Sequence, residues 1–180
     1  MNRHLAAMLL ITASVAHAFA ATPTDTAGEQ RPALRLTNGE SSVERLVERF
    51  RRALIDKDKQ ALRALRVTQD EYVEIIMAGG IDPGQPRGSD YSEQAKQYFW
   101  GVLNGRSIYT EANLLAEYGG HPFKVTDVTY RKGVKQYADY RAYKQLELTL
   151  EDDAGRVDRL RIGSIAEIDG QFKFISYVRD

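Results

Sequence analysis

The sequence has no cysteine and only three histidines among its 180 residues. A chain without cysteine forms no disulfide, holds no metal through thiolates and has no thiol nucleophile. It also lacks the cysteine to which the lipid of a bacterial lipoprotein is attached. His121 is the only histidine beyond the first twenty residues, and one histidine does not make a histidine-rich zinc site. The composition therefore predicts a protein with neither a metal nor a cofactor.

An excess of charge of either sign is also missing, because 25 basic residues balance 25 acidic ones. Proteins that bind nucleic acid usually present a clustered basic surface, and a neutral composition does not indicate one. Beyond the N-terminus, no apolar stretch approaches the about 20 residues that a membrane-spanning helix needs. We therefore expect neither nucleic-acid binding nor a membrane span.

The first twenty residues, Met1–Ala20, have the pattern of a secretory signal peptide. Arg3 precedes an apolar run, Leu5–Val15, that is too short to cross a bilayer. Small residues then take the spacing that a signal peptidase accepts, at Ala16–Ala18 or Ala18–Ala20. The pattern predicts export, cleavage, and a periplasmic or secreted mature protein. Cleavage removes one basic residue of 25 and leaves 24 against 25 acidic ones, a net charge of −1.

A linker and one domain follow the signal peptide. Residues 21–40 are rich in Thr, Pro, Gly and charge without a hydrophobic period, which predicts a flexible linker. Residues 41–180 have the length of a single domain. Apolar residues recur at helical spacing in the first half of this domain. The expected helices cover residues 43–54, 60–65 and 68–76, a fourth from 89 or 90 to 103, and 110–118.

Local signals mark the ends of these helices. Ser41 and Glu44 have the spacing of a capping box, in which a hydroxyl and a carboxylate bind reciprocal backbone amides. Thr68 and Glu71 repeat that spacing. The segment Ala78–Gly88 carries glycines and prolines that sustain neither a helix nor a central strand. It lacks the lysine of a phosphate-binding loop, so we expect a mobile lip over a pocket.

After His121 the hydrophobic period changes from helical to two, which predicts strands. The expected strands cover residues 123–130, 137–150, 157–168 and 172–178. Between the last two, Asp169 and Gly170 form a strong signal for a type I′ hairpin turn. The second and third strands join through residues 153–155, a three-residue loop with its glycine in the left-handed conformation, or through a four-residue loop.

The three-residue loop sets a specific register for this hairpin. It pairs Leu148 with Leu160 and Glu147 with Arg161. Apolar residues then face each other on one side of the sheet, and charged residues face each other on the other side. Both faces of the last two strands carry apolar residues, whereas a sheet wet on one side alternates more cleanly. We therefore expect helices on one face and a loop or a second subunit on the other, which leaves a homodimer open.

The predicted fold is α+β, with N-terminal helices packed on a curved four-stranded antiparallel sheet as a cone-like roll. This order resembles the cystatin-like α+β roll of the nuclear transport factor 2-like superfamily, over roughly residues 41–180. Phe99–Gly101, Ala116–Gly120 and Ile175–Val178 look like a group of uncharacterised exported bacterial proteins. The resemblance implies a cone that often holds a ligand and an outer face that often dimerises. The superfamily includes isomerases, dehydratases and non-catalytic binding modules, so fold alone does not assign function.

Aromatic side chains with polar tips are the main binding candidates, because they suit a groove for a small molecule or a peptide. Four of them lie in the fourth expected helix and the second expected strand, and an arginine of the strands would serve as polar anchor. The candidate ligand-binding residues are Trp100, Tyr98, Tyr140, Tyr143, Arg141 and Arg161. The alternative for the aromatic residues is packing at a core edge or at a dimer surface.

We expect an exported, non-catalytic module that binds a small molecule or a protein partner. The alternative is a cofactor-free enzyme of the same fold in which a pocket carboxylate transfers a proton. Asp139, Glu147 or Glu167 would supply that carboxylate if its strand pointed it into the cone. Cross-strand charge pairing on an outer face is the competing interpretation. His121 follows two glycines and precedes a proline, so we expect it in an exposed turn.

Overall fold

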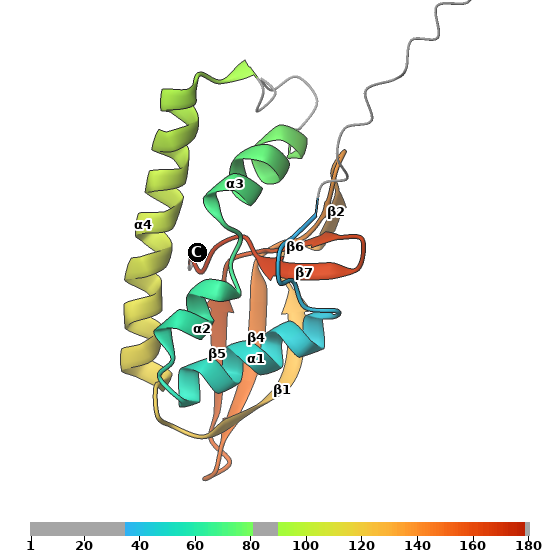
Figure 1. Cartoon of the computed structure of the whole chain (residues 1–180). Helices are drawn as coiled ribbons and strands as arrows, with labels where there is room; N and C mark the ends of the chain where they lie inside the picture. Colours follow the sequence, from blue (N-terminus) through green and yellow to red (C-terminus); the bar gives the residue numbers. More distant parts are fainter. Residues whose placement is uncertain (1–34, 81–89, 179–180) are drawn as a thin grey trace, which may run out of the picture. The chain divides into compact units, whose positions relative to one another are not determined.

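The computed structural model describes residues 35–80 and 90–178 (Figure 1). The expected signal peptide, residues 1–20, lies outside these ranges, as do residues 21–34 of the expected linker and residues 81–88 of the glycine-rich segment. All described residues belong to one compact unit, which covers residues 32–180. Helices occupy the first half of this unit and strands the second, which confirms the α+β class.

Four α-helices and one π-helix precede seven strands in the described residues. The helices are α1 (Val43–Ile55), α2 (Lys59–Ala64), α3 (Gln69–Glu71), the π-helix η1 (Tyr72–Met77) and α4 (Glu93–Tyr118). The strands are β1 (Phe123–Tyr130), β2 (Val134–Gln136), β3 (Arg141–Tyr143), β4 (Leu146–Asp152), β5 (Val157–Ile162), β6 (Ile165–Ile168) and β7 (Gln171–Phe174).

Helix α1 is amphipathic, and its apolar stripe forms much of the core. The stripe is buried at Val43, Leu46, Val47, Phe50, Ala53 and Leu54. Its N-cap is Ser42, whose extended backbone lets the side chain accept a hydrogen bond from the Arg45 amide. The predicted cap at Ser41 is therefore wrong by one residue. The capping-box spacing identified the helix start and missed its position, because two serines stand side by side.

Two other local predictions are confirmed. Thr68 and Glu71 form a capping box at the start of α3, with each side chain accepting from the other residue's backbone amide. Asp169 and Gly170 both have positive φ, 48° and 71°, as a type I′ turn requires. These signals are local, and the residues that carry them leave the backbone few alternatives.

The strands form two antiparallel sheets, in the orders β1-β4-β5 and β2-β3-β6-β7. Strands β6 and β7 run crosswise to the first sheet, and α1 lies across that sheet (Figure 1). The register of the β4–β5 hairpin is as predicted, with Leu148 opposite Leu160 and Glu147 opposite Arg161. The loop of this hairpin has three residues, 153–155, between Asp152 and Arg156, whose backbones are hydrogen-bonded to each other. Its glycine, Gly155, has a φ of 74°.

The sequence predicts four strands in one sheet, whereas the described residues form seven strands in two sheets. Two of the expected long strands are each broken in two, and β2 is an additional strand. The expected strand 137–150 is interrupted at Gln145, which has a positive φ of 54° between β3 and β4. The expected strand 157–168 is interrupted at Gly163, between β5 and β6. A Cβ on Gly163 would lie 2.2 Å from the carbonyl oxygen of Ser176, so the close approach of these two segments requires glycine.

Helix α4 is continuous from Glu93 to Tyr118, whereas the sequence predicts two separate helices. Gly105 lies inside it, at a cost of about 1 kcal/mol relative to alanine. Contacts hold the C-terminal half: Ser107 is fully buried and its Oγ accepts a hydrogen bond from the Tyr177 amide at 3.4 Å. Packing thus overrides the weak propensity at the glycine. None of the described helices is long and apolar enough to cross a membrane.

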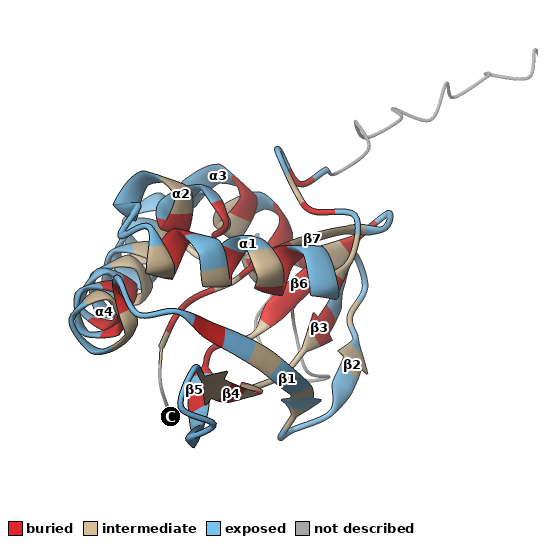
Figure 2. Cartoon of the chain, turned by 90° about the horizontal axis from the view of Figure 1, so that it is seen from below, coloured by how far each residue is buried: buried red, intermediate tan, exposed pale blue. Residues whose placement is uncertain are grey.

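Two clusters of buried side chains form the core, with the buried side of α1 facing the strands (Figure 2). The larger cluster joins α1, α2 and the end of α4 to β1, β4 and β5. Phe50, Phe174 and Tyr177 meet in it with ring centroids 5.2 to 5.5 Å apart. The smaller cluster joins η1 to β3 and β6. Its buried members are Leu36, Val67, Ile75, Ile76, Tyr140, Ala142, Ala166 and Ile168.

Candidate functional site

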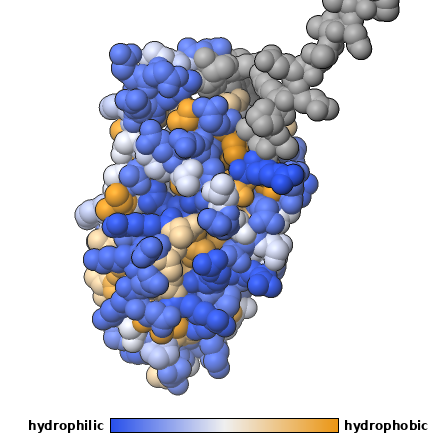
Figure 3. Space-filling model, viewed as in Figure 1, coloured by the Kyte–Doolittle hydropathy of each residue, from blue (hydrophilic) through white to orange (hydrophobic). Residues whose placement is uncertain are grey.

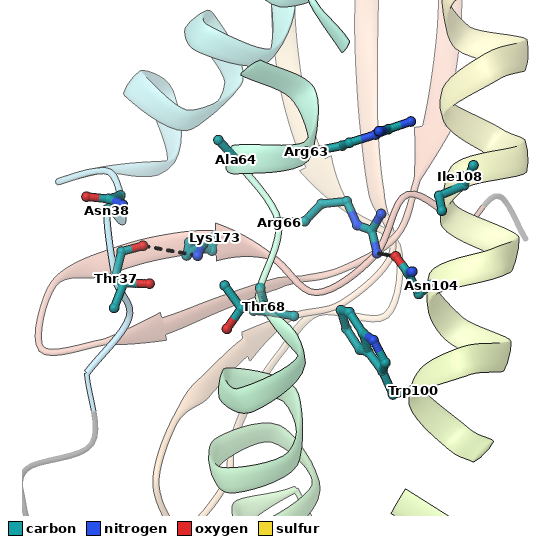
Figure 4. Close-up of a pocket in the computed structure, with 11 residues that line it drawn as sticks. Thr37, Asn38, Arg63, Ala64, Arg66, Thr68, Trp100, Asn104, Ile108 and Lys173 are labelled. Carbon is teal, nitrogen blue, oxygen red and sulfur yellow. Dashed lines mark hydrogen bonds between the residues drawn. The ribbon is translucent and has the colours of Figure 1, made fainter. Parts of the chain in front are cut away.

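A pocket of about 390 Å³ lies between α4, the segment that joins α2 to α3, and β7 (Figure 4). The lining includes three cationic side chains, several amide and hydroxyl groups, and an apolar part from α4. The lining residues are Thr37, Asn38, Arg63, Ala64, Arg66, Val67, Thr68, Trp100, Asn104, Ile108 and Lys173. None of these described residues is acidic, so the wall of the pocket is positively charged.

Arg66 is the most unusual residue of this wall. Its backbone bridges to Phe174, and Val67 donates to the Phe174 carbonyl at 2.8 Å, so β7 fixes where the side chain starts. The side chain then runs inward and the residue is only 4% exposed. Its Nη2 donates to the amide oxygen of Asn104 at 3.0 Å. Its Nε is buried and has no acceptor among the described residues.

In the described part of the chain, no carboxylate lies within 4 Å of the Arg66 guanidinium. Burial lowers its pKa, but an arginine in a protein stays protonated. The guanidinium carbon lies 5.7 Å from the centroid of the Tyr177 ring, a cation–π contact. The negative charge of Glu111 also acts on Arg66 from beyond 4 Å. One neutral acceptor, one ring and this more distant charge compensate only in part for the desolvation of a charge, which costs several kcal/mol. Arg66 is thus a buried cation that a bound anion would neutralise.

Lys173 is equally buried, at 2% exposed, and it does have a counter-ion. Its Nζ donates to Glu71 Oε2 at 2.7 Å and to the Thr37 carbonyl at 3.0 Å. Glu71 also accepts from the Thr68 amide and from both the amide and the hydroxyl of Thr37. Burial opposes ionisation of Glu71, yet these hydrogen bonds outweigh it, and the pKa of this carboxyl is lowered. The network fixes the floor of the pocket.

The remaining cation, Arg63, is about half-exposed and lies 3.3 Å from Glu111 Oε1. Glu111 is 2% exposed and comes from the buried face of α4. The two carboxylates beside the pocket each pair with one cation: Glu71 with Lys173 and Glu111 with Arg63. Three cations and two carboxylates leave one positive charge, and Arg66 is the cation that has no carboxylate within 4 Å among the described residues.

Helix α4 supplies one wall through Trp100, Asn104 and Ile108. These residues are spaced by four, so they lie on one face of the helix. Figure 4 shows them on the same side of the pocket, with Thr37, Asn38 and Lys173 across from them. Trp100 is also held from behind by Tyr72 of η1, with ring centroids 5.6 Å apart. The wall thus has an amide between two apolar surfaces.

Of the six residues predicted to bind a ligand, the structure places Trp100 alone in this pocket. Tyr98 is two residues away on α4 but 68% exposed, with its ring against Phe99. Tyr140 is buried in the smaller core cluster, where it stacks on Tyr137 at 4.9 Å. Burial raises the pKa of Tyr140. For Tyr140 the structure shows core packing, the alternative that the sequence left open.

The other three predicted residues lie on the sheets and pair with carboxylates. Arg141 Nη1 is 3.1 Å from Glu167 Oε2, and the Tyr143 hydroxyl donates to the same oxygen at 2.8 Å. Arg161 Nε is 2.7 Å from Glu147 Oε2 across the β4–β5 pair. Cross-strand charge pairing therefore occurs at these positions. Ligand binding by the six residues stays a prediction, and the structure does not bring them together.

Helix α4 also exposes large apolar side chains, most of which lie outside the pocket. They are Tyr98, Phe99, Val102, Ile108 and Tyr109, of which Ile108 also lines the pocket. On the face seen in Figure 3, hydrophobic side chains form separate small groups among hydrophilic ones. His121 is exposed in a turn after α4, as predicted. No group of three or more His, Asp or Glu side chains in the described residues is arranged to hold a metal ion.

Sequence reasoning missed Arg66 and Lys173. Lys173 lies between Phe172 and Phe174, and alternation places it on the face opposite to theirs, where a solvent-facing lysine is the usual expectation. Arg66 follows a short helix with no distinctive neighbours. One available signal was the spacing of Trp100, Asn104 and Ile108, which marks a helix face with one amide between two apolar residues.

No protein-family model matches the sequence, and no curated protein or solved structure matches it. The chemistry of the pocket is accordingly the basis on which a function is proposed.

Proposed function

We propose that this protein is an exported, non-catalytic module that binds a small anion in the pocket lined by Arg66. The observation that carries the proposal is the state of Arg66: a buried guanidinium whose Nε has no partner, and which has no carboxylate within 4 Å, among the described residues. Buried polar groups in native proteins nearly always have partners, and an exception calls for an explanation. A ligand that brings its own negative charge supplies the missing partner.

The surroundings of Arg66 support a binding pocket. Its volume, about 390 Å³, lies at the small end of the roughly 300–1,000 Å³ range of small-molecule sites. It combines an apolar wall with a few convergent polar groups, which is the usual composition of such sites. The buried pair of Lys173 and Glu71 holds one side of it in place, so little ordering is needed when a ligand binds.

Binding is favoured over proton transfer by the state of the nearby carboxylates. A carboxylate that acts as a general base near neutral pH usually has a raised pKa and a free oxygen aimed at the substrate. Glu71 instead has a lowered pKa and accepts from Lys173, Thr37 and Thr68. Glu111 pairs with Arg63 and is not among the described residues that line the pocket.

We also propose that the domain is a cone-like roll of the nuclear transport factor 2-like superfamily. The order of elements supports this, because helices precede antiparallel strands and α1 lies across a sheet (Figure 1). The crosswise course of β6 and β7 is what a strongly bent sheet would produce. Export and a periplasmic or secreted location rest on the pattern of residues 1–20.

The direct test is native mass spectrometry of the protein purified from its own host. We expect a protein mass with an additional small molecule that is lost on denaturation. Arg66→Met, which keeps an unbranched stem of similar length to the aliphatic part of arginine and removes the charged group, should be purified without that molecule. Arg156→Met is the matched control, because Arg156 is an exposed arginine outside the pocket, and it should retain the ligand. A ligand that persists in Arg66→Met would contradict the proposed site.

A further inference from the structure

We infer that the occupant of this pocket is a monocarboxylate with a flat apolar body, whose carboxylate takes the place of the Asn104 amide oxygen at Arg66. This inference rests on the proposed function and specifies its ligand. Three independent properties of the pocket lead to it: its net charge, the hydrogen bonding of the guanidinium, and the apolar surfaces on either side of Asn104.

The charge of the pocket favours a single negative charge on the ligand. Lys173 and Arg63 already have carboxylates at 2.7 Å and 3.3 Å, which leaves the charge of Arg66 to be matched. A carboxylate matches it with one unit. A phosphate monoester carries about −1.5 to −2 at neutral pH, so it would add repulsion from Glu71 and Glu111. Since both of those carboxylates are buried, water screens that repulsion weakly.

The hydrogen bonding of Arg66 shows where the carboxylate would bind. Nη2 donates to Asn104 Oδ1 at 3.0 Å, whereas the adjacent Nε has no acceptor in the part of the chain that the structure describes. A carboxylate has two oxygens and can accept from two guanidinium nitrogens at once, and such charge-assisted bonds are roughly twice as strong as neutral ones. Arg66 is covered in the structure, so its ligand must displace a neighbour. Asn104 is that neighbour, because it is only partly buried and lines the pocket.

The surroundings of Asn104 indicate the body of the ligand. Trp100 lies one helical turn before it and Ile108 one turn after it, on the same face of α4 (Figure 4). A carboxylate bound at this point would therefore have its apolar part between a ring and an aliphatic side chain. A flat group suits the face of Trp100, since aromatic rings favour offset or edge contacts with each other. The volume of about 390 Å³ fits one or two rings.

The chain offers a direct reporter, because Trp100 is its only tryptophan. We would follow tryptophan fluorescence while titrating the purified protein with benzoate, benzamide, acetate and phenyl phosphate, in a buffer free of carboxylate and phosphate. Benzoate should bind at least about tenfold more tightly than benzamide, which has the shape without the charge. The affinity of benzoate should also exceed that of acetate by at least about tenfold, because acetate lacks the ring. Benzoate should also bind more tightly than phenyl phosphate.

Two variants test the mechanism of binding. Asn104→Ala removes the acceptor that the ligand must displace, so benzoate should bind roughly two- to tenfold more tightly, the equivalent of one neutral hydrogen bond. Alanine suits the middle of a helix, and position 104 is only partly buried, so this variant should fold. Arg66→Met should bind benzoate at least about tenfold more weakly. Arg156→Met, outside the pocket, should bind it as the unmodified protein does.

Each outcome separates the ligand class from the proposed function. Tighter binding of phenyl phosphate than of benzoate would overturn the monocarboxylate and leave an anion pocket. Weaker benzoate binding in Asn104→Ala would overturn the displacement of the amide. Equal binding of benzoate and benzamide, unchanged in Arg66→Met, would overturn the role of the charge. If no probe binds while native mass spectrometry finds a ligand that depends on Arg66, the ligand class is wrong; if that ligand is also missing, the proposed function fails.

Discussion

Lys173 of β7 and Glu71 of α3 form a buried ion pair, with Nζ 2.7 Å from Oε2 and both residues at most 5% exposed. Their separation of 102 residues makes the pair a link between the helical and the stranded halves of the domain. It also holds the backbone of Thr37, and with it the segment before α1, at the edge of the pocket. The pair therefore has a structural role that differs from the role proposed for Arg66.

Replacement of Glu71 by Gln should destabilise the protein by about 3–5 kcal/mol, because it leaves the buried charge of Lys173 unpaired. Chemical denaturation at neutral pH measures the change in the free energy of unfolding. Glu93→Gln is the matched control, since Glu93 also pairs with a lysine but is exposed, and it should cost less than about 1 kcal/mol. Similar losses in the two variants would contradict a stabilising role for the buried pair.

The same carboxyl predicts a dependence of stability on pH. The pKa of Glu71 is lower in the folded protein than its ordinary value of 4.5, because its hydrogen bonds outweigh the effect of burial. Its contribution is therefore complete above pH 4.5 and is lost as the pH falls toward the folded-state pKa. Unfolding measured from neutral to acid pH should show a steeper loss of stability in the unmodified protein than in Glu71→Gln. If the free energies of unfolding of the two proteins fall in parallel with pH, the pKa of Glu71 is the same in the folded and the unfolded state, which would contradict the prediction.

Glu48 offers a surface comparison. The hydrogen bond from Arg51, together with the hydrogen bond from Arg52 and the charges of both arginines, lowers its pKa to about 2, against the opposing effect of burial. NMR titration of the Glu48 carboxyl should find this low value, the ordinary one being 4.5. Because the carboxylate is partly exposed, Glu48→Gln should cost no more than about 1 kcal/mol. A pKa near the ordinary value would mean that the arginines of α1 do not hold this carboxylate in solution.

Two glycines provide a matched pair of substitutions with opposite expected effects. A Cβ on Gly105 in α4 would have no described atom within 4 Å apart from its chain neighbours and its own helix backbone, so Gly105→Ala should stabilise the protein by about 1 kcal/mol. Gly163→Ala places a methyl group 2.2 Å from the Ser176 carbonyl oxygen and should destabilise it by about 1–3 kcal/mol. Thermal unfolding distinguishes the two. A destabilising effect of Gly105→Ala would indicate that α4 is not continuous at this point.

Much of the fold could be predicted from the sequence because its signals are local. The Asp169-Gly170 turn, the Thr68 cap and the register that pairs Leu148 with Leu160 all follow from residues close together in the chain. The broken strands could not be predicted in the same way. Apolar residues continue through the break, and they are buried on both sides of it: Leu160 and Ile162 before, and Ile165, Ala166 and Ile168 after. The contact that requires the break comes from Ser176, which belongs to another segment.

The candidate site was less predictable, because its partners are distant in sequence. Arg66 meets Asn104 at a separation of 38 residues, and neither residue has a local pattern that predicts the contact. The aromatic cluster expected from composition separates in space, since Tyr140 lies in the core while Tyr98 faces solvent. Trp100 is the residue that sequence reasoning and the structure share.

The central claim is that Arg66 is buried for the sake of a ligand, and the free energy of unfolding of Arg66→Met tests it most directly. Arg66→Met removes a buried charge that has no ion-pair partner, and with it the free-energy cost of desolvating that charge. In a buffer free of carboxylate and phosphate, the variant should therefore be at least as stable as the unmodified protein. Benzoate should then raise the stability of the unmodified protein in proportion to the logarithm of its concentration, and leave the variant unchanged. If Arg66→Met instead loses several kcal/mol and benzoate stabilises neither protein, Arg66 is a structural residue and the account is wrong.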